Sequence, residues 1–253
     1  MSMRAPAFLV SVALLVSVPV AAQQQNTLDT LDVAHKVVVG TNALRRQDGQ
    51  RQVAGNAQLT NAALEFARFL SRSDEISHTA DGRRPEERAK QHGYDYCIVS
   101  ENLAQRYNSE GFSVDELVQG FLQGWERSPG HRKNMHNPEV TEIGVAVVRN
   151  ENSGHYYAVQ MFGRPQSDMI VFEMTNSSTT AIPYALGNRT YSLLPGYTRT
   201  HRECGAVKFE IQWPDDQPPI TVAPGNGDRL AIVGDAAGKL RLKRELVSDS
   251  RTK

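Results

Sequence analysis

The spacing of apolar residues changes once along this chain, close to residue 165, and the change predicts two different folds in one protein. Before it, apolar residues recur at the three- and four-residue spacing of amphipathic helices, and two alternating segments close the stretch. After it, short apolar runs are separated by turn signals such as Pro195-Gly196. The pattern therefore predicts an α+β domain over residues 23–167 and a small all-β accessory domain over residues 168–240.

The first region carries recognisable signals where its helices should begin. Asn56 stands where an N-cap is expected, Pro85 suits a first helical turn, and Ser113 with Glu116 can form a capping box. A loop rich in Asn, Ser and Gly separates two apolar runs that we expect to pair as antiparallel strands. The expected helices are 31–44, 59–70, 85–93 and 113–125, and the expected strands are 143–148 and 156–162.

The short strands of the second region are expected to form a small antiparallel sandwich, because they recur at regular spacing with turns between them. Residues 241–253 are rich in charge, which predicts a loose tail. The expected strands are 169–174, 182–186, 190–194, 207–213, 220–222 and 229–233.

The start of the chain has the pattern of a secretory signal peptide. Arg4 precedes a mostly apolar run, and Val20-Ala21-Ala22 supplies the small residues of a cleavage site. The run is too short for a comfortable membrane span. We therefore expect a signal peptide over 1–22, no transmembrane segment after its removal, and a secreted or periplasmic location.

Charge and cysteine content bear on the partners and the compartment. The chain has 28 basic and 28 acidic side chains, so its charge does not predict nucleic acid or an anionic membrane as a partner. Cys97 and Cys204 are too few for a disulfide scaffold. In an exported protein they either pair or remain two buried thiols, and the sequence leaves both alternatives open.

Three motifs place polar residues at turns of the first region. His78 comes first, Glu101 begins the sequence Glu-Asn-Leu-Ala, and His131 follows a Ser-Pro-Gly turn that starts at Ser128. In this order and spacing they resemble the motifs of the CAP superfamily, which comprises cysteine-rich secretory, antigen 5 and pathogenesis-related class 1 proteins, and above all its bacterial SCP-domain members. The resemblance implies a three-layer α-β-α sandwich over 23–167, with a cleft that contains these residues.

More positions match the family pattern, and one departs from it. Eukaryotic members usually have a second glutamate where this chain has Ser128, so the acidic part of the cleft is reduced here. We recognise no family in the second region. The further matching positions are Asn42, Arg45, Leu59, Ala63, Asp81, Gly82, Arg88, Gly93 and the segment 156–163.

The resemblance makes His78, Glu101, Ser128 and His131 the candidate cleft residues. It also makes His78 and His131 the candidate ligands of zinc or another divalent ion. Two histidines and one acid offer few ligands for a metal site, because catalytic zinc needs three protein ligands. Without the resemblance, the same residues would be interpreted as a hydrogen-bonded cluster that holds helices and loops together.

Three functions are compatible with these residues. We favour a binding or interaction module whose His/Glu cleft takes a small-molecule, lipid or envelope ligand. The alternative is a hydrolase, with or without a metal ion, that uses His78, Glu101 and His131. No catalytic residue is assigned, since Ser128 lacks the Gly-x-Ser-x-Gly surroundings of a nucleophile elbow. The third function is a structural protein of the envelope.

Overall fold

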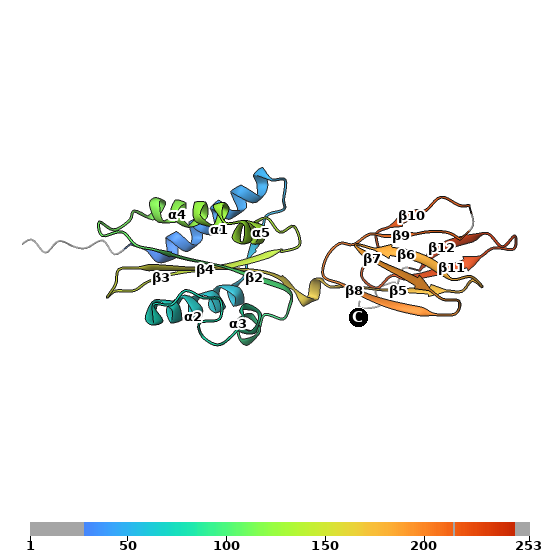
Figure 1. Ribbon diagram of the computed structural model, residues 1–253, viewed down its shortest axis with the longest axis horizontal. Coiled ribbons are helices and arrows are strands. Elements are labelled where there is room, and N and C mark those ends of the chain that lie inside the picture. The colour runs from blue at the N-terminus through green and yellow to red at the C-terminus, as the bar shows by residue number, and fades with distance from the viewer. Residues whose placement is uncertain (1–27, 215, 246–253) are drawn as a thin grey trace, which may run out of the picture.

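The chain folds into two lobes joined end to end (Figure 1). The computed structural model describes residues 28–214 and 216–245. We call residues 28–165 the N-lobe and residues 170–245 the C-lobe. The expected signal peptide lies outside the described residues.

The N-lobe is one four-stranded sheet with helices on both faces, as Figure 1 shows. This confirms the α-β-α sandwich. The strand order is β1-β3-β4-β2, so β2 is an edge strand. One helical layer contains α1 (Thr30–Gln47), α4 (Val114–Arg127) and α5 (Pro129–Met135), the other contains α2 (Ala57–Ser73) and α3 (Pro85–Gln91), and the strands are β1 (Ala54–Gly55), β2 (Tyr96–Arg106), β3 (Glu142–Arg149) and β4 (Tyr156–Pro165).

The helices begin where the sequence signals predict. The Asn56 side chain accepts hydrogen bonds from two backbone amides of α2, and Ser113 and Glu116 form a reciprocal capping box on α4. Pro85 occupies the first turn of α3, and Gly93 follows that helix with φ of +81°, a conformation that favours glycine. The ends of α3 are therefore fixed locally, which matters because α3 carries a residue of the site.

Each face of the N-lobe sheet has its own apolar core. Trp125 and Phe121 of α4 pack on one face, and Phe66 and Leu70 of α2 pack on the other. Eight consecutive residues of β4 are buried, as expected of a central strand covered on both sides.

The C-lobe consists of two four-stranded sheets with an apolar core between them. Burial alternates along its strands, as in β6, because each sheet has only one covered face. The pairing of β5 with β11 is parallel, so one sheet is mixed rather than purely antiparallel. The sheet orders are β10-β9-β6-β7 and β12-β11-β5-β8. The strands of this lobe are β5 (Ile170–Asn176), β6 (Ile182–Leu186), β7 (Arg189–Leu193), β8 (Thr198–Glu203), β9 (Phe209–Ile211), β10 (Ile220–Val222), β11 (Arg229–Gly234) and β12 (Leu240–Glu245).

Two C-lobe strands differ from the sequence prediction. The expected tail over 241–253 is wrong in its first part, because β12 pairs with β11 along its whole length. Leu240 and Leu242 pack towards the core while charged residues alternate with them. Strand β8 was not predicted, since its side chains are mostly polar, but it pairs with β5 as an edge strand.

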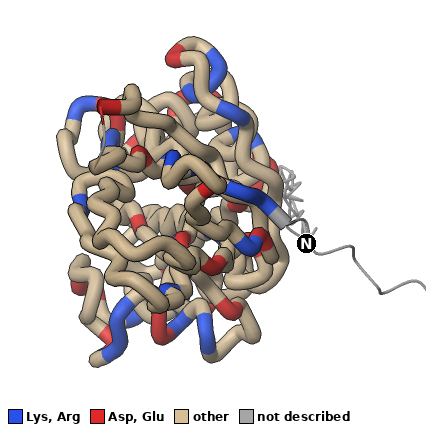
Figure 2. The backbone as a smooth tube through the Cα atoms, turned by 90° about the vertical axis from the view of Figure 1, so that its right-hand side faces the viewer, with Lys and Arg blue, Asp and Glu red and all other residues tan. Residues whose placement is uncertain are grey.

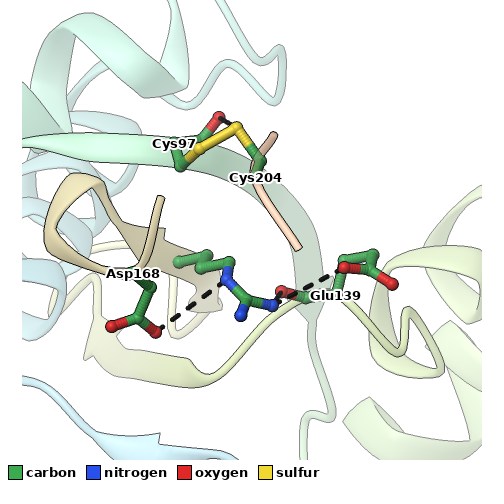
Figure 3. The surroundings of a disulfide bond; sticks show 5 residues. Cys97, Glu139, Asp168 and Cys204 are labelled. Carbon is green, nitrogen blue, oxygen red and sulfur yellow. Dashed lines mark hydrogen bonds and ion pairs between the residues drawn. A yellow bond between two sulfur atoms is a disulfide. The ribbon is translucent and has the colours of Figure 1, made fainter. Parts of the chain in front are cut away.

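The lobes are joined twice. The chain passes through the short helix η1 (Gln166–Asp168), and a disulfide links Cys97 of β2 to Cys204 just after β8, with Cα atoms 5.5 Å apart (Figure 3). Of the two alternatives that the sequence left open, the structure has the paired one. Arg164 of β4 donates to the backbone oxygen of Glu139 at 3.1 Å.

Charges of both signs are interspersed along the backbone in the view of Figure 2. Among the helices of the described ranges, none has the length and apolar character that a bilayer span demands.

Candidate functional site

Strand β2 sends two adjacent polar side chains to opposite faces of the sheet. The carboxylate of Glu101 meets Arg88 of α3, whereas the amide of Asn102 meets α5 on the other side. Successive side chains of a strand alternate in this way. A single dipeptide therefore connects both helical layers at the open edge of the sheet.

The Glu101 carboxylate is buried in an ion pair. Its side chain is 0% exposed and that of Arg88 is 1% exposed, and one guanidinium nitrogen lies 3.0 and 2.9 Å from the two carboxylate oxygens. The other terminal nitrogen of Arg88 donates to Asp81 at 2.8 Å. The guanidinium also lies over the ring of Phe66, 3.6 Å from its centroid. These contacts compensate a charge that burial alone would make costly.

His78 is held by this carboxylate. Its Nδ1 lies 2.8 Å from Oε1 of Glu101, and because an ionised carboxylate only accepts, Nδ1 is the donor. The His78 side chain is 49% exposed, and within the described ranges its Nε2 has no hydrogen-bond partner. The structure thus brings together two of the candidate residues and leaves one ring nitrogen open to solvent.

Asn102 anchors the short helix that carries His131. Its Nδ2 donates to the backbone oxygen of His131 at 3.1 Å and to Gln160 at 2.9 Å. Its Oδ1 accepts from Asn134 at 2.9 Å. Because Asn102 and Gln160 are both 0% exposed, these amides satisfy one another inside the protein. These hydrogen bonds consequently hold α5 next to strand β2, beside Glu101.

Side chains also cover the open edge of β2. Asn134 donates to the backbone oxygen of Glu101 at 3.1 Å, and Trp125 donates through Nε1 to that of Leu103 at 2.9 Å. These two carbonyls are therefore unavailable to an added strand, which otherwise pairs readily with a free edge. The edge presents side chains rather than backbone at this point.

His131 lies on α5 and is partly buried. Burial lowers the pKa of His131, and the nearby charge of His78 lowers it further. Within the described ranges its ring makes no hydrogen bond or ion pair, with Glu101 or with any other residue, and only its backbone oxygen accepts from Asn102. The link between the two histidines is electrostatic.

Ser128 begins α5 directly after α4 ends. Its backbone oxygen accepts from Arg132 at 2.8 Å, but its side chain forms no capping hydrogen bond. Nothing in the described part of the molecule joins its hydroxyl to His131, and the structure therefore gives no activated serine.

The donors at this site do not fit a zinc centre. Both Glu101 oxygens are engaged by Arg88, and Nδ1 of His78 is engaged by Glu101. Only ring nitrogens of His78 and His131 remain, whereas zinc sites use three or four protein ligands. Across the described ranges, no group of three or more His, Cys, Asp or Glu side chains has an arrangement that would hold a metal ion.

Five hollows on the surface lie away from this site, and none of the five is lined by His78, Glu101 or His131. The largest of the five, of about 840 Å³, lies between the start of α1 and the β3–β4 hairpin. The candidate site is therefore separate from these five hollows.

Arg88, Asp81 and Asn102 complete the site, but sequence reasoning assigned them no role in it. Arg88 and Asp81 appeared only as positions that match a family pattern, and Asn102 only as part of a motif. No local signal singled out Arg88, because it stands among the charged residues of segment 83–90 and only the structure shows that it is buried.

Comparison with known proteins agrees with the fold. Residues 40–162 match the model of the CAP family, described as the cysteine-rich secretory protein family. The chain is 28% identical over 152 residues to the uncharacterized protein YkwD of Bacillus subtilis (strain 168), a match that covers 58% of this chain and 55% of that protein. The chain therefore spans about half the length of this curated relative.

The matches to solved structures also cover about half of this chain. An outer surface protein from Borrelia burgdorferi is 21% identical, with a TM-score of 0.48 over 55% of this chain and 96% of that one. An extracellular SCP-domain protein from Bacillus anthracis str. Ames is 23% identical, with a TM-score of 0.45 over 53% of this chain and 41% of that one.

By its fold, the N-lobe is a small α-β-α domain, and His78 and His131 lie next to its edge strand β2. The family match makes the class specific: the N-lobe is a CAP domain of the bacterial type. The matched range ends before the C-lobe begins.

Proposed function

We propose that the N-lobe is a binding module that acts outside the cytoplasm and takes its ligand at His78, Glu101 and His131. The observation that carries the proposal is the contact between His78 and Glu101. A fully buried carboxylate holds one nitrogen of a half-exposed imidazole and leaves the other nitrogen open.

Two features support a location outside the cytoplasm. The sequence before residue 23 has the composition of a cleavable signal peptide. The Cys97–Cys204 disulfide is of a kind that forms and persists in oxidising compartments. N-terminal sequencing of the exported protein should begin at Gln23, and an intact Met1 in a cytoplasmic pool would contradict export.

We further propose that residues 23–167 and 168–240 are separate domains. Each lobe has its own core, and the family match is confined to the first. The ligand is a small molecule, a lipid or an envelope component, and nucleic acid is not part of the proposal.

A panel of probes tests the binding role. Soluble peptidoglycan fragments, a fatty acid and a short glucan are each titrated into the whole protein, and the ring C–H signals of His78 and His131 are followed by NMR. We expect at least one probe to shift both signals, and the variant with His78→Ala and His131→Ala to lose the binding.

The matched control is His35→Ala, which removes an exposed histidine from the outer face of α1. This variant should bind like the wild type. Shifts at neither ring with any of the three probes, or equal binding by the double variant, would overturn the proposed site.

A hydrolase is the second candidate, because the same contact would let Nε2 of His78 accept a proton. Chromogenic ester and peptide substrates test it. Turnover that disappears in His78→Ala, with no zinc requirement, would favour the hydrolase over the binding module. Absence of both binding and turnover would leave a structural envelope role.

A further inference from the structure

We propose that Arg88, assisted by Asp81, is a positioning residue that sets the tautomer of His78, so that Nε2 faces the ligand as a hydrogen-bond acceptor. This inference rests on the proposed binding site, and it names the chemistry of its ligand. The group that meets His78 is a donor, such as a hydroxyl or an N–H, and not a carboxylate or phosphate oxygen.

Arg88 touches both parts of His78 that determine how its ring lies. One terminal nitrogen donates to the backbone oxygen of His78 at 2.9 Å. The same nitrogen holds both oxygens of Glu101, which in turn accepts from the ring at Nδ1. A single guanidinium therefore fixes the backbone of the residue and the carboxylate that orients its side chain.

The guanidinium is itself held in place from several sides. Its other terminal nitrogen donates to Asp81 at 2.8 Å and to the backbone oxygen of Arg83 at 2.7 Å. The Asp81 side chain is 3% exposed, and Phe66 covers one face of the guanidinium. These contacts restrain Arg88, and Arg88 in turn restrains the Glu101 carboxylate.

The consequence for His78 follows from the nature of the groups. A neutral imidazole has one N–H, and the hydrogen bond made by one nitrogen decides which of the two carries it. Glu101 can only accept, so the proton sits on Nδ1 and the lone pair sits on Nε2, in a side chain that is 49% exposed. A ligand oxygen without a proton would face that lone pair and be repelled.

The tautomer is visible in ¹⁵N NMR of the histidine rings at a pH where His78 is neutral. In the wild type we expect the Nδ1 shift of His78 in the range of a protonated nitrogen and its Nε2 shift in the range of a bare one. Arg88→Met should move the two shifts towards each other, because Glu101 loses its fixed position. Arg88→Lys retains the charge and should restore most of the wild-type separation.

The control for general destabilisation is Arg45→Met. Arg45 is also a fully buried arginine of the N-lobe, but it donates to the backbone oxygens of Arg51, Met135 and Asn137 and does not touch the Glu101 cluster. It should leave the His78 shifts unchanged even where stability falls.

If Arg88→Met does not fold, the pair Arg88→Met with Glu101→Leu takes its place. Replacing both members of a buried ion pair with apolar residues of similar size is often neutral for stability. This pair should also lose the separation of the two shifts. The proposal is overturned if wild-type His78 carries its proton on Nε2, or if these variants keep the wild-type shifts.

The outcome is independent of ligand binding. Should the shifts behave as expected while no probe binds, the positioning role stands and the proposed function fails. Should a probe bind through His78 without the expected tautomer, the binding site stands and the role of Arg88 fails.

Discussion

The two lobes bury different kinds of side chain. The N-lobe encloses arginine, glutamate and amide groups that bond to one another, whereas the C-lobe core consists mainly of aromatic and aliphatic residues such as Phe172, Tyr184 and Phe209. The C-lobe has fewer enclosed polar groups, and these include Asn176 and His201. Buried polar groups are therefore concentrated where the candidate site lies.

The geometry of the sheets explains the contrast. In the N-lobe, helices cover both faces of the sheet, so a polar residue on β2 meets protein whichever way it points. In the C-lobe each strand has one open face, and polar side chains can simply turn outward. Placing charge inside the N-lobe requires a complete set of partners, and this set is what orients His78.

The largest effect is expected from the disulfide, which joins the two lobes. A loop of this length contributes about 4.7 kcal/mol to the free energy of unfolding in the chain-entropy model. Removing it through Cys97→Ser with Cys204→Ser should let the lobes unfold separately. The measurement is urea unfolding with fluorine-labelled Trp125 and Trp213, one in each lobe.

Wild-type protein kept in reductant is the matched control and should behave like the double variant. Coincident transitions of the two tryptophans in the double variant would show that the interface, rather than the disulfide, couples the lobes.

Arg88→Met should have the next largest effect and should act on the N-lobe alone. It leaves Glu101 and Asp81 buried without their cation, which lowers the free energy of unfolding by about 3–5 kcal/mol. The Trp125 signal should report this loss and the Trp213 signal should not. Arg84→Met, at an arginine whose side chain is 64% exposed, should change stability by less than about 0.5 kcal/mol.

The same contrast shows why the sequence predicted some elements and not others. Strand β6 was predicted with its observed bounds, since a short apolar run there ends at the turn signal Gly187-Asn188. Strand β2 was not predicted as a strand, because Glu101 and Asn102 break any regular apolar pattern. Their burial depends on Arg88 and Gln160, which are distant in sequence, so no local signal reveals it.

The candidate site was predicted only in part for the same reason. The motifs supplied His78, Glu101 and His131, and the structure adds the direct contact between the first two. Which nitrogen of His78 is engaged, and what holds Glu101, depend on three-dimensional contacts of Arg88. The place of Ser128 in a turn does not determine where its hydroxyl points, and the structure shows only that its side chain makes no capping hydrogen bond.

A smaller effect is expected in the C-lobe as pH falls. Burial lowers the pKa of His201, which is 5% exposed and hydrogen-bonded to Tyr184. The unfolded state then binds a proton more readily than the folded state, so stability is full above the ordinary histidine pKa of about 6.5 and declines as pH falls below it. The decline is at most about 1.4 kcal/mol per pH unit.

The measurement for this prediction is urea unfolding reported by Trp213 at pH 7 and pH 5. His201 is the one histidine in the sequence after residue 155, so His201→Gln should remove most of the pH dependence of the C-lobe. An unchanged dependence in that variant would assign it to carboxylates instead.

The most direct test of the account is the titration of His131 by NMR, in the wild type and in His78→Asn. If the two rings share one site, the pKa of His131 lies below 6.5 in the wild type, because it is partly buried and near the charge of His78. Removing His78 should raise the pKa of His131 while burial keeps it below the ordinary value. A His131 pKa that is the same in both proteins would show that the rings do not sense one another, and it would contradict a common binding site at the edge of β2.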